Sequence, residues 1–172
     1  MIQVEGIFAG GATKPYIEET YDSGGNLIDV KLHGYTKIRD NAFSGCNKLA
    51  LTSLPDDIVS IGVGAFLNCL SLAITSLPDG LMSIGGEAFN NCPNLALTSL
   101  PDGLTSIGDF AFGRCTGLTS LTFMGAPTSI EPYAFDGCEN LTTINVPWAE
   151  GAVANAPWGA ANATINYNYT GG

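Results

Sequence analysis

Residues 107–123, IGDFAFGRCTGLTSLTF, decide the fold of this 172-residue chain, because their main features return every 23 residues. Four apolar positions recur in five copies without an insertion. They are Ile38, Ile61, Ile84, Ile107 and Ile130; Phe43, Phe66, Phe89, Phe112 and Phe135; Cys46, Cys69, Cys92, Cys115 and Cys138; and Leu49, Leu72, Leu95, Leu118 and Leu141. Four registers at one interval predict a solenoid, in which each copy makes one coil and buries its apolar side only against its neighbours.

Each copy contains two extended pieces and two turns. Leu118–Phe123 alternates in the manner of a short strand, with its apolar side chains turned inward, and residues 105–108 form a second short extended piece. Pro-Asp-Gly at 101–103 predicts a turn, because proline presets φ and glycine tolerates positive φ. Ala111–Cys115 is predicted to form a helical or 3₁₀ turn, since five residues cannot sustain a long helix.

The repeated pattern Ile-Gly-x-x-Ala-Phe-x-x-Cys-x-x-Leu, followed by a strand and Leu-Pro-Asp, resembles the BspA-like class of bacterial leucine-rich repeats over about residues 38–147. The resemblance implies an α/β repeat fold, a right-handed leucine-rich-repeat solenoid of short parallel β-strands and short helical or 3₁₀ turns. It also implies an extracellular or cell-surface location, and several members of the family are adhesins for host matrix proteins.

The first three copies depart from the family pattern in the strand, where Thr52, Thr75 and Thr98 occupy an aliphatic position. Either these threonines point inward with their hydroxyls bonded to the backbone, or a bulge turns the preceding Leu51, Ile74 and Leu97 inward. A third alternative leaves those three aliphatic residues exposed as a stripe. Exposed apolar ladders invite aggregation, which favours the first two alternatives.

The chain divides into an N-terminal cap at 1–34, five repeats at 35–147 and a C-terminal cap at 148–172. In the first cap, residues 16–21 and 27–32 flank a glycine-rich turn and predict a β-hairpin. In the second, Trp148 and Trp158 are predicted to cover the last coil, with ligand stacking as the alternative. Residues 163–169 alternate between apolar and polar and predict a final half-buried strand.

Charge and hydropathy exclude some classes of partner. Sixteen acidic residues against six basic ones give a formal charge of −10, which repels nucleic-acid phosphates and anionic membrane surfaces. No apolar run reaches the roughly 18–20 residues that a membrane span needs. Residues 1–6 lack the positive flank and apolar stretch of a secretory signal. The protein therefore stays inside, belongs to a longer exported chain, or leaves by another route.

The cysteines are not arranged for disulfides or metal binding. Equivalent Cβ atoms in stacked strands lie about 4.8 Å apart, whereas a disulfide needs about 3.8 Å. We therefore expect buried free thiols that act as small apolar side chains. No Cys-x-x-Cys pair or neighbouring histidine suggests a tetrahedral metal site.

A catalytic constellation is not evident either. His33, the single histidine, has no nucleophile motif around it and is expected to be a packing or surface residue. Asp56, Asp79 and Asp102 recur after a proline and are expected to form turns, with a weak calcium site as the alternative. We expect no enzyme activity and no cofactor.

Binding residues are sought where the copies differ, since positions that vary within a rigid repeat are expected to face solvent. The two residues before each Ala-Phe differ from copy to copy. Among them, Glu87, Asp109, Phe110 and Tyr133 are the candidate binding residues. Phe110 and Tyr133 fall in adjacent coils and should form an aromatic spot. Packing between neighbouring coils is the favoured explanation and recognition the alternative.

These observations predict a non-catalytic protein-interaction or adhesion module with a protein or glycan ligand. The alternative is a structural spacer or an assembly component of a larger surface or phage-like protein. The sequence does not predict the oligomeric state.

Overall fold

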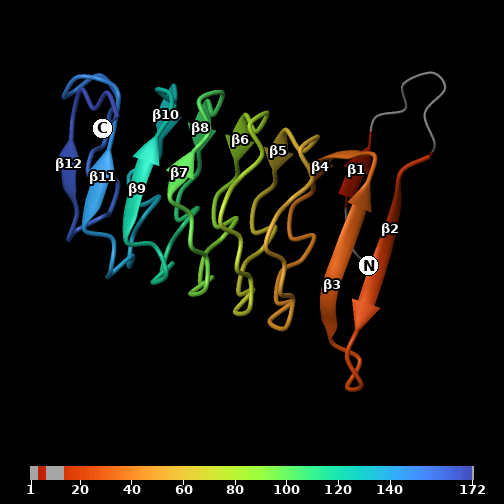
Figure 1. The fold of residues 1–172 in the computed structure, drawn as a ribbon. Helices are drawn as coiled ribbons and strands as arrows, with labels where there is room; N and C mark the ends of the chain where they lie inside the picture. The colour runs from red at the N-terminus through yellow and green to blue at the C-terminus, as the bar shows by residue number, and fades with distance from the viewer. Residues whose placement is uncertain (1–3, 7–13, 172) are drawn as a thin grey trace.

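The computed structural model describes residues 4–6 and 14–171, so residues 1–3, 7–13 and 172 of the expected caps lie outside it (Figure 1). The chain winds into a row of stacked coils between an N-terminal hairpin and a final strand. Coils 1 to 5 are numbered here by their phenylalanines at 43, 66, 89, 112 and 135, and coil 6 contains Trp158. The strands are β1 (Val4–Gly6), β2 (Tyr16–Tyr21), β3 (Leu27–His33), β4 (Tyr35–Ile38), β5 (Ser60–Ile61), β6 (Ser83–Ile84), β7 (Ser99–Leu100), β8 (Ser106–Ile107), β9 (Ser120–Phe123), β10 (Ser129–Ile130), β11 (Thr143–Asn145) and β12 (Thr164–Asn166).

Two parallel ladders join the coils. One sheet has the order β1-β4-β5-β6-β8-β10, in which only β1 runs antiparallel to its neighbour. Its parallel strands pair isoleucine with isoleucine, as Ile61 with Ile84 and Ile84 with Ile107. The other sheet, β12-β11-β9-β7, covers the C-terminal half. This in-register parallel pairing confirms the stacking of equal coils that the 23-residue interval predicts.

The phenylalanines form a continuous column through the interior. All five side chains are fully buried, and consecutive rings are stacked with centroids 5.2–5.5 Å apart. The leucines at 49, 72, 95, 118 and 141 form a second fully buried column. Each coil therefore buries its apolar side against the coils before and after it, as nearest-neighbour stacking requires.

The predicted helical turn at Ala111–Cys115 is not confirmed, and none of the described residues is assigned to a helix. The backbone hydrogen bonds of this segment alternate in direction. Gly113 and Cys115 donate to carbonyl groups three residues earlier, whereas Phe112 and Arg114 donate to carbonyl groups of the next coil. Because every second N–H is used between coils, the segment forms consecutive turns instead of a continuous helix.

The structure decides between the alternatives for the threonine-containing copies. Leu51, Ile74 and Leu97 are buried, with exposed fractions of 7%, 0% and 2%. The threonines that follow them, at 52, 75 and 98, are exposed. The alternative in which the register shifts and the preceding aliphatic residue points inward is therefore correct, and the inward-threonine alternative is wrong.

The N-terminal hairpin of β2 and β3 is confirmed. The Asp22 carboxylate closes its turn by accepting hydrogen bonds from the backbone N–H groups of Gly24 and Asn26. His33, at the end of β3, stacks on Tyr16 with ring centroids 4.2 Å apart. The hairpin joins the stack through the Ala50 N–H, which donates to the Ile28 carbonyl.

Two tryptophans pack in the interior of the C-terminal end. Trp158 is fully buried, and its carbonyl accepts a hydrogen bond from the Phe135 N–H of the preceding coil. Its ring lies 6.3 Å from Trp148 and 6.0 Å from Phe123, measured between centroids. The final strand β12 is shorter than the alternating segment from which it was predicted. Coil 6 therefore continues the stack, with β12 as the edge strand of its sheet.

Candidate recognition surface

The cysteines that recur every 23 residues are packed as unreactive thiols. All five are free, and only Cys46 is not buried. Each of the other four donates from Sγ to the backbone carbonyl of a phenylalanine in the preceding coil, over 3.0–3.1 Å. Burial raises the pKa of Cys92 and of Cys138 to about 12. Because the thiolate is the form that attacks electrophiles and binds metals, these side chains act structurally.

The aspartates that follow a proline lie in turns of successive coils. Asp79 is exposed in a turn closed by the Leu81 N–H and the Pro78 carbonyl, and Asp56 and Asp102 are exposed in equivalent turns. Within the described ranges, no group of three His, Cys, Asp or Glu side chains could hold a metal ion. Over the same ranges, no helix is long and apolar enough to span a bilayer.

The four candidate binding residues come together on one side of coils 3 to 5. Glu87, Asp109 and Tyr133 are exposed, and Phe110 is half-buried. The Phe110 and Tyr133 rings stack with centroids 5.5 Å apart and planes 13° apart. The Glu87 N–H donates to the Asp109 carbonyl over 2.8 Å, which ties coil 3 to coil 4 at this point. The aromatic spot expected from the sequence is therefore present, and it packs one coil on the next.

Backbone conformation distinguishes this part of the surface. Two positions adopt positive φ in each of coils 1 to 4, and one of them does so in coil 5; six of these nine residues are glycine or asparagine, which tolerate it. These are Asn41, Gly45, Gly64, Asn68, Asn91 and Gly137. At the same two positions, Glu87, Phe110 and Arg114 adopt φ of 56°, 52° and 56°. A side chain of this kind in the left-handed region costs about 1–2 kcal/mol. Trp158 in coil 6 also adopts positive φ, of 52°, whereas the other three such residues, Glu87, Phe110 and Arg114, lie in coils 3 and 4.

These three strained residues line one hollow. Its volume is 240 Å³, and Asn90 and Asp136 complete its lining. Asn90 and Asp136 occupy the same repeat position in coils 3 and 5, and the residue between them in coil 4 is Gly113. A Cβ atom built on Gly113 would lie 3.1 Å from Asn90 Oδ1. Gly113 is buried and does not itself line the hollow, which lies beside Asn90 of coil 3 and Asp136 of coil 5. We call it the Gly113 hollow after the residue between these two in the repeat.

The charges around the Gly113 hollow are of both signs. Arg114 is the only basic residue after Lys48, whereas residues 49–172 contain ten acidic ones. The hollow places this single guanidinium beside Glu87 and Asp136. Sequence reasoning identified Glu87 and Phe110 here but missed Asn90, Arg114 and Asp136. The available signal was the glycine at 113, in a column that otherwise holds Ser44, Leu67, Asn90 and Asp136.

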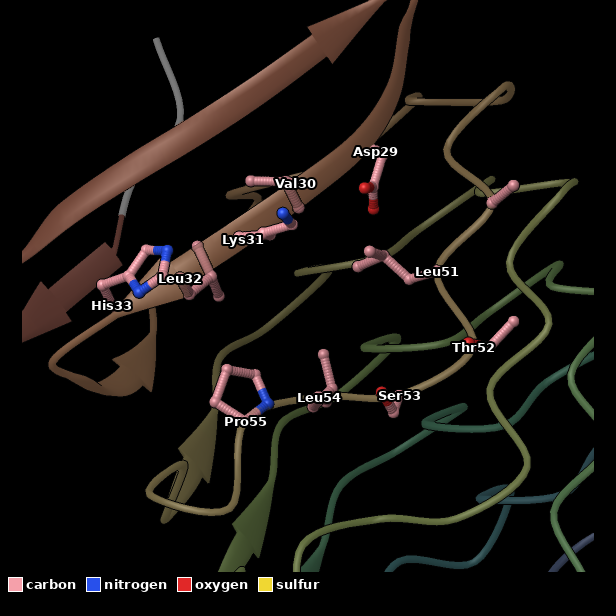
Figure 2. Close-up of a pocket in the computed structure, with 11 residues that line it drawn as sticks. Asp29, Val30, Lys31, Leu32, His33, Leu51, Thr52, Ser53, Leu54 and Pro55 are labelled. Atoms are coloured by element: carbon pink, nitrogen blue, oxygen red, sulfur yellow. The ribbon is translucent and has the colours of Figure 1, made fainter.

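A second concave region lies at the N-terminal end of the stack. Beyond the bond between Ala50 and Ile28, β3 turns away from coil 1 and leaves a groove of 590 Å³ between Asp29–His33 and Leu51–Pro55 (Figure 2). The equivalent segments of coils 1 and 2 stay bonded, since the N–H groups of Ala73 and Thr75 donate to carbonyl groups of coil 1. The groove therefore marks the place where the cap departs from the repeat. No sequence pattern in residues 29–33 or 51–55 predicts this groove.

Comparison with known proteins agrees with the repeat pattern. A family model described as BspA-type leucine-rich repeat region, with six copies, matches residues 36–152. No curated protein sequence matches the chain. A leucine-rich repeat protein of T. pallidum has a similar fold, with a TM-score of 0.63 and 24% identity over 89% of this chain and 79% of its own.

A leucine-rich cell surface protein from Faecalibacterium prausnitzii is similar as well. Its TM-score is 0.64 and its identity 26%, over 78% of this chain. The chain covers only 38% of that protein.

Proposed function

The chain belongs to the BspA-type leucine-rich repeat family, and from this premise we propose that it is a non-catalytic recognition module on a bacterial cell surface. Membership of this repeat family is consistent with a protein-interaction function. The cell-surface protein of F. prausnitzii, with 26% identity, supports the location. The ligand of the module is a protein or a glycan, bound at the surface that contains Glu87, Asp109, Phe110 and Tyr133.

The observation that carries this proposal is the strain at the Gly113 hollow. Unfavourable backbone conformations persist only when the surrounding structure imposes them, and they cluster at ligand sites. Glu87, Phe110 and Arg114 occupy positions where coils 1 and 2 use glycine or asparagine at no comparable cost. Stability alone favours asparagine at these positions, so the side chains present are better explained by binding.

The scaffold beneath the hollow favours recognition, because it holds the surface in one shape. Phe112 lies directly below in the stacked column, 5.5 Å from Phe89 and 5.3 Å from Phe135 between centroids. A surface that is already ordered loses little conformational entropy when a ligand binds. The coils therefore present their side chains pre-organised.

The test compares binding and stability in the same variants. The wild-type chain is immobilised and assayed against matrix proteins and glycans, and a saturable partner is expected. Arg114→Asn gives coil 4 the residue that coils 2 and 3 hold at Asn68 and Asn91. It should keep or raise stability, by about 1 kcal/mol, while binding weakens.

Asn68→Gly, at the same repeat position in coil 2, is the matched control and should leave binding unchanged. Absence of any saturable partner across the panel contradicts the function. Binding that is unaffected by Arg114→Asn and by Phe110→Asn contradicts the site.

A further inference from the structure

We propose that the Gly113 hollow binds one neutral, hydroxyl-rich sugar ring of a glycan. The inference rests on the proposed recognition function and names the ligand class of that site. The hollow is lined by Glu87, Asn90, Phe110, Arg114 and Asp136.

The hydrogen-bonding groups of the lining select the ligand. Glu87 and Asp136 offer carboxylate oxygens that only accept, Arg114 offers N–H groups that only donate, and Asn90 does both. A cationic ligand is repelled by the Arg114 guanidinium, and an anionic ligand is repelled by the two carboxylates. A hydroxyl group donates and accepts at once. A ring carrying several hydroxyls is therefore the ligand that satisfies the whole lining.

These charged groups are available to a ligand. Among the residues that the structure describes, no ion pair within 4.0 Å joins Arg114 to Glu87 or to Asp136. Glu87, Arg114 and Asp136 are exposed, and Asn90 is half-buried. Their side-chain hydrogen-bonding capacity is therefore not consumed by one another. Hydrogen bonds to charged groups contribute more than those between neutral groups.

Phe110 supplies an apolar wall. Its ring is held by stacking on Tyr133, so little side-chain freedom remains to be lost on binding. A sugar ring has a face of C–H groups as well as its hydroxyls, and such a face packs against an aromatic ring as other apolar groups do. The combination of one aromatic wall with polar groups of both kinds matches the two sides of a sugar.

The size of the hollow sets the extent of the ligand. Pockets that enclose a drug-sized molecule span about 300–1,000 Å³, and this one has 240 Å³. It therefore accepts one ring, with the rest of a glycan continuing over the surface of the neighbouring coils.

The experiment measures sugar binding by the full chain when the hollow is open and when it is filled. The probes are neutral hexoses and N-acetylhexosamines, followed by saturation-transfer NMR, and a glycan array identifies larger ligands. Gly113→Leu places in coil 4 the residue that coil 2 carries at Leu67. Its Cβ atom would lie 3.1 Å from Asn90 Oδ1, so the new side chain displaces Asn90 at the hollow and should abolish saturation transfer. Ser44→Leu introduces the same residue at the same repeat position in coil 1 and should leave binding intact.

Asp136→Asn is the second variant, because the exposed side chain can be changed without filling space in the fold. It should weaken sugar binding roughly tenfold, as expected for one charge-assisted hydrogen bond. Both variants are checked for wild-type thermal unfolding. If Gly113→Leu does not fold, Asp136→Asn still decides the assignment.

The outcomes separate this inference from the function on which it rests. Sugar binding that both variants reduce supports the assignment. A protein partner without sugar binding overturns the sugar assignment and leaves the recognition function standing, whether or not Gly113→Leu affects that partner. Sugar binding that survives both variants overturns the site. No binding to any protein or glycan overturns both proposals.

Discussion

Each interior side chain of the solenoid has nearly the same neighbours as its equivalent in the next coil. Phe89, for example, stacks between Phe66 and Phe112 with centroids 5.4 Å and 5.5 Å away. Phe43, at the start of the column, has one such phenylalanine neighbour, at 5.2 Å. The energetic importance of a repeated residue should therefore depend on its place in the stack.

Replacing Phe89 with alanine should lower the free energy of unfolding by about 3–5 kcal/mol, because it removes a ring from both stacking contacts and leaves a cavity. The same change at Phe43 should cost less. Urea unfolding followed by circular dichroism measures both. Equal losses would contradict the nearest-neighbour description.

Because of the buried thiols, the free energy of unfolding depends on pH in the alkaline range. Burial raises the pKa of Cys92 from 9.0 to about 12. Between these values the unfolded chain loses a proton that the folded chain keeps, so stability falls as pH rises. The contribution is fully present below pH 9, and the slope is about 1.4 kcal/mol per pH unit for each such thiol. Cys92→Ala should make the decline in unfolding free energy between pH 9 and 11 shallower. Cys46→Ala, at the half-buried thiol, should change the slope less.

At the scale of the element, the sequence predicted what is local or strictly repeated. The hairpin of β2 and β3 has a glycine-rich turn between alternating segments, and the parallel ladder follows from the fixed interval. The helical or 3₁₀ turn predicted at Ala111–Cys115 is not confirmed, because every second N–H of the segment bonds to the next coil, which local propensity does not reveal. The inward position of Leu51 is a packing outcome and was left open for the same reason.

The candidate site was predicted only in part for a related reason. Phe110 and Tyr133 are recognisable as variable positions within the repeat. The Gly113 hollow is lined by residues of coils 3, 4 and 5, so it depends on three coils at once. Reading the sequence in columns as well as along the chain makes such sites visible.

Close approach between coils gives a prediction for one turn. A Cβ atom on Gly108 would lie 2.3 Å from the Gly86 backbone nitrogen. Gly108→Ala must therefore separate coils 3 and 4, and it should cost about 1–3 kcal/mol, as overpacking does. In Gly103→Ala, the nearest atom would be 3.8 Å away, and stability should be unchanged or raised by about 0.4–1 kcal/mol. Thermal unfolding of the two variants measures the contrast, and similar losses in both would contradict it.

For the whole molecule, the ends of the stack matter because the coils between them could otherwise add to one another without limit. We expect coil 6 to cap the C-terminal end through Trp158, which is fully buried and donates from Nε1 to the Ala154 carbonyl over 2.7 Å. Its contacts with Trp148 and Phe123 tie the last coil to coil 4. An open end would expose apolar side chains and unpaired strand edges, which favour association with other chains.

Trp158→Ala should therefore act at one end of the molecule first. The loss should be about 3–5 kcal/mol for the coil that contains the residue, and because coils are coupled only to their neighbours, coil 6 should open before the rest. Hydrogen exchange should show faster exchange at Val146 and Thr164 than at Ile61, and size-exclusion chromatography with light scattering should show concentration-dependent oligomers. Tyr169→Ala changes an exposed aromatic of the same cap and should leave both measurements unchanged. Uniformly faster exchange through all coils would instead show that the solenoid unfolds as a single cooperative unit, and end capping would then not explain the tryptophan.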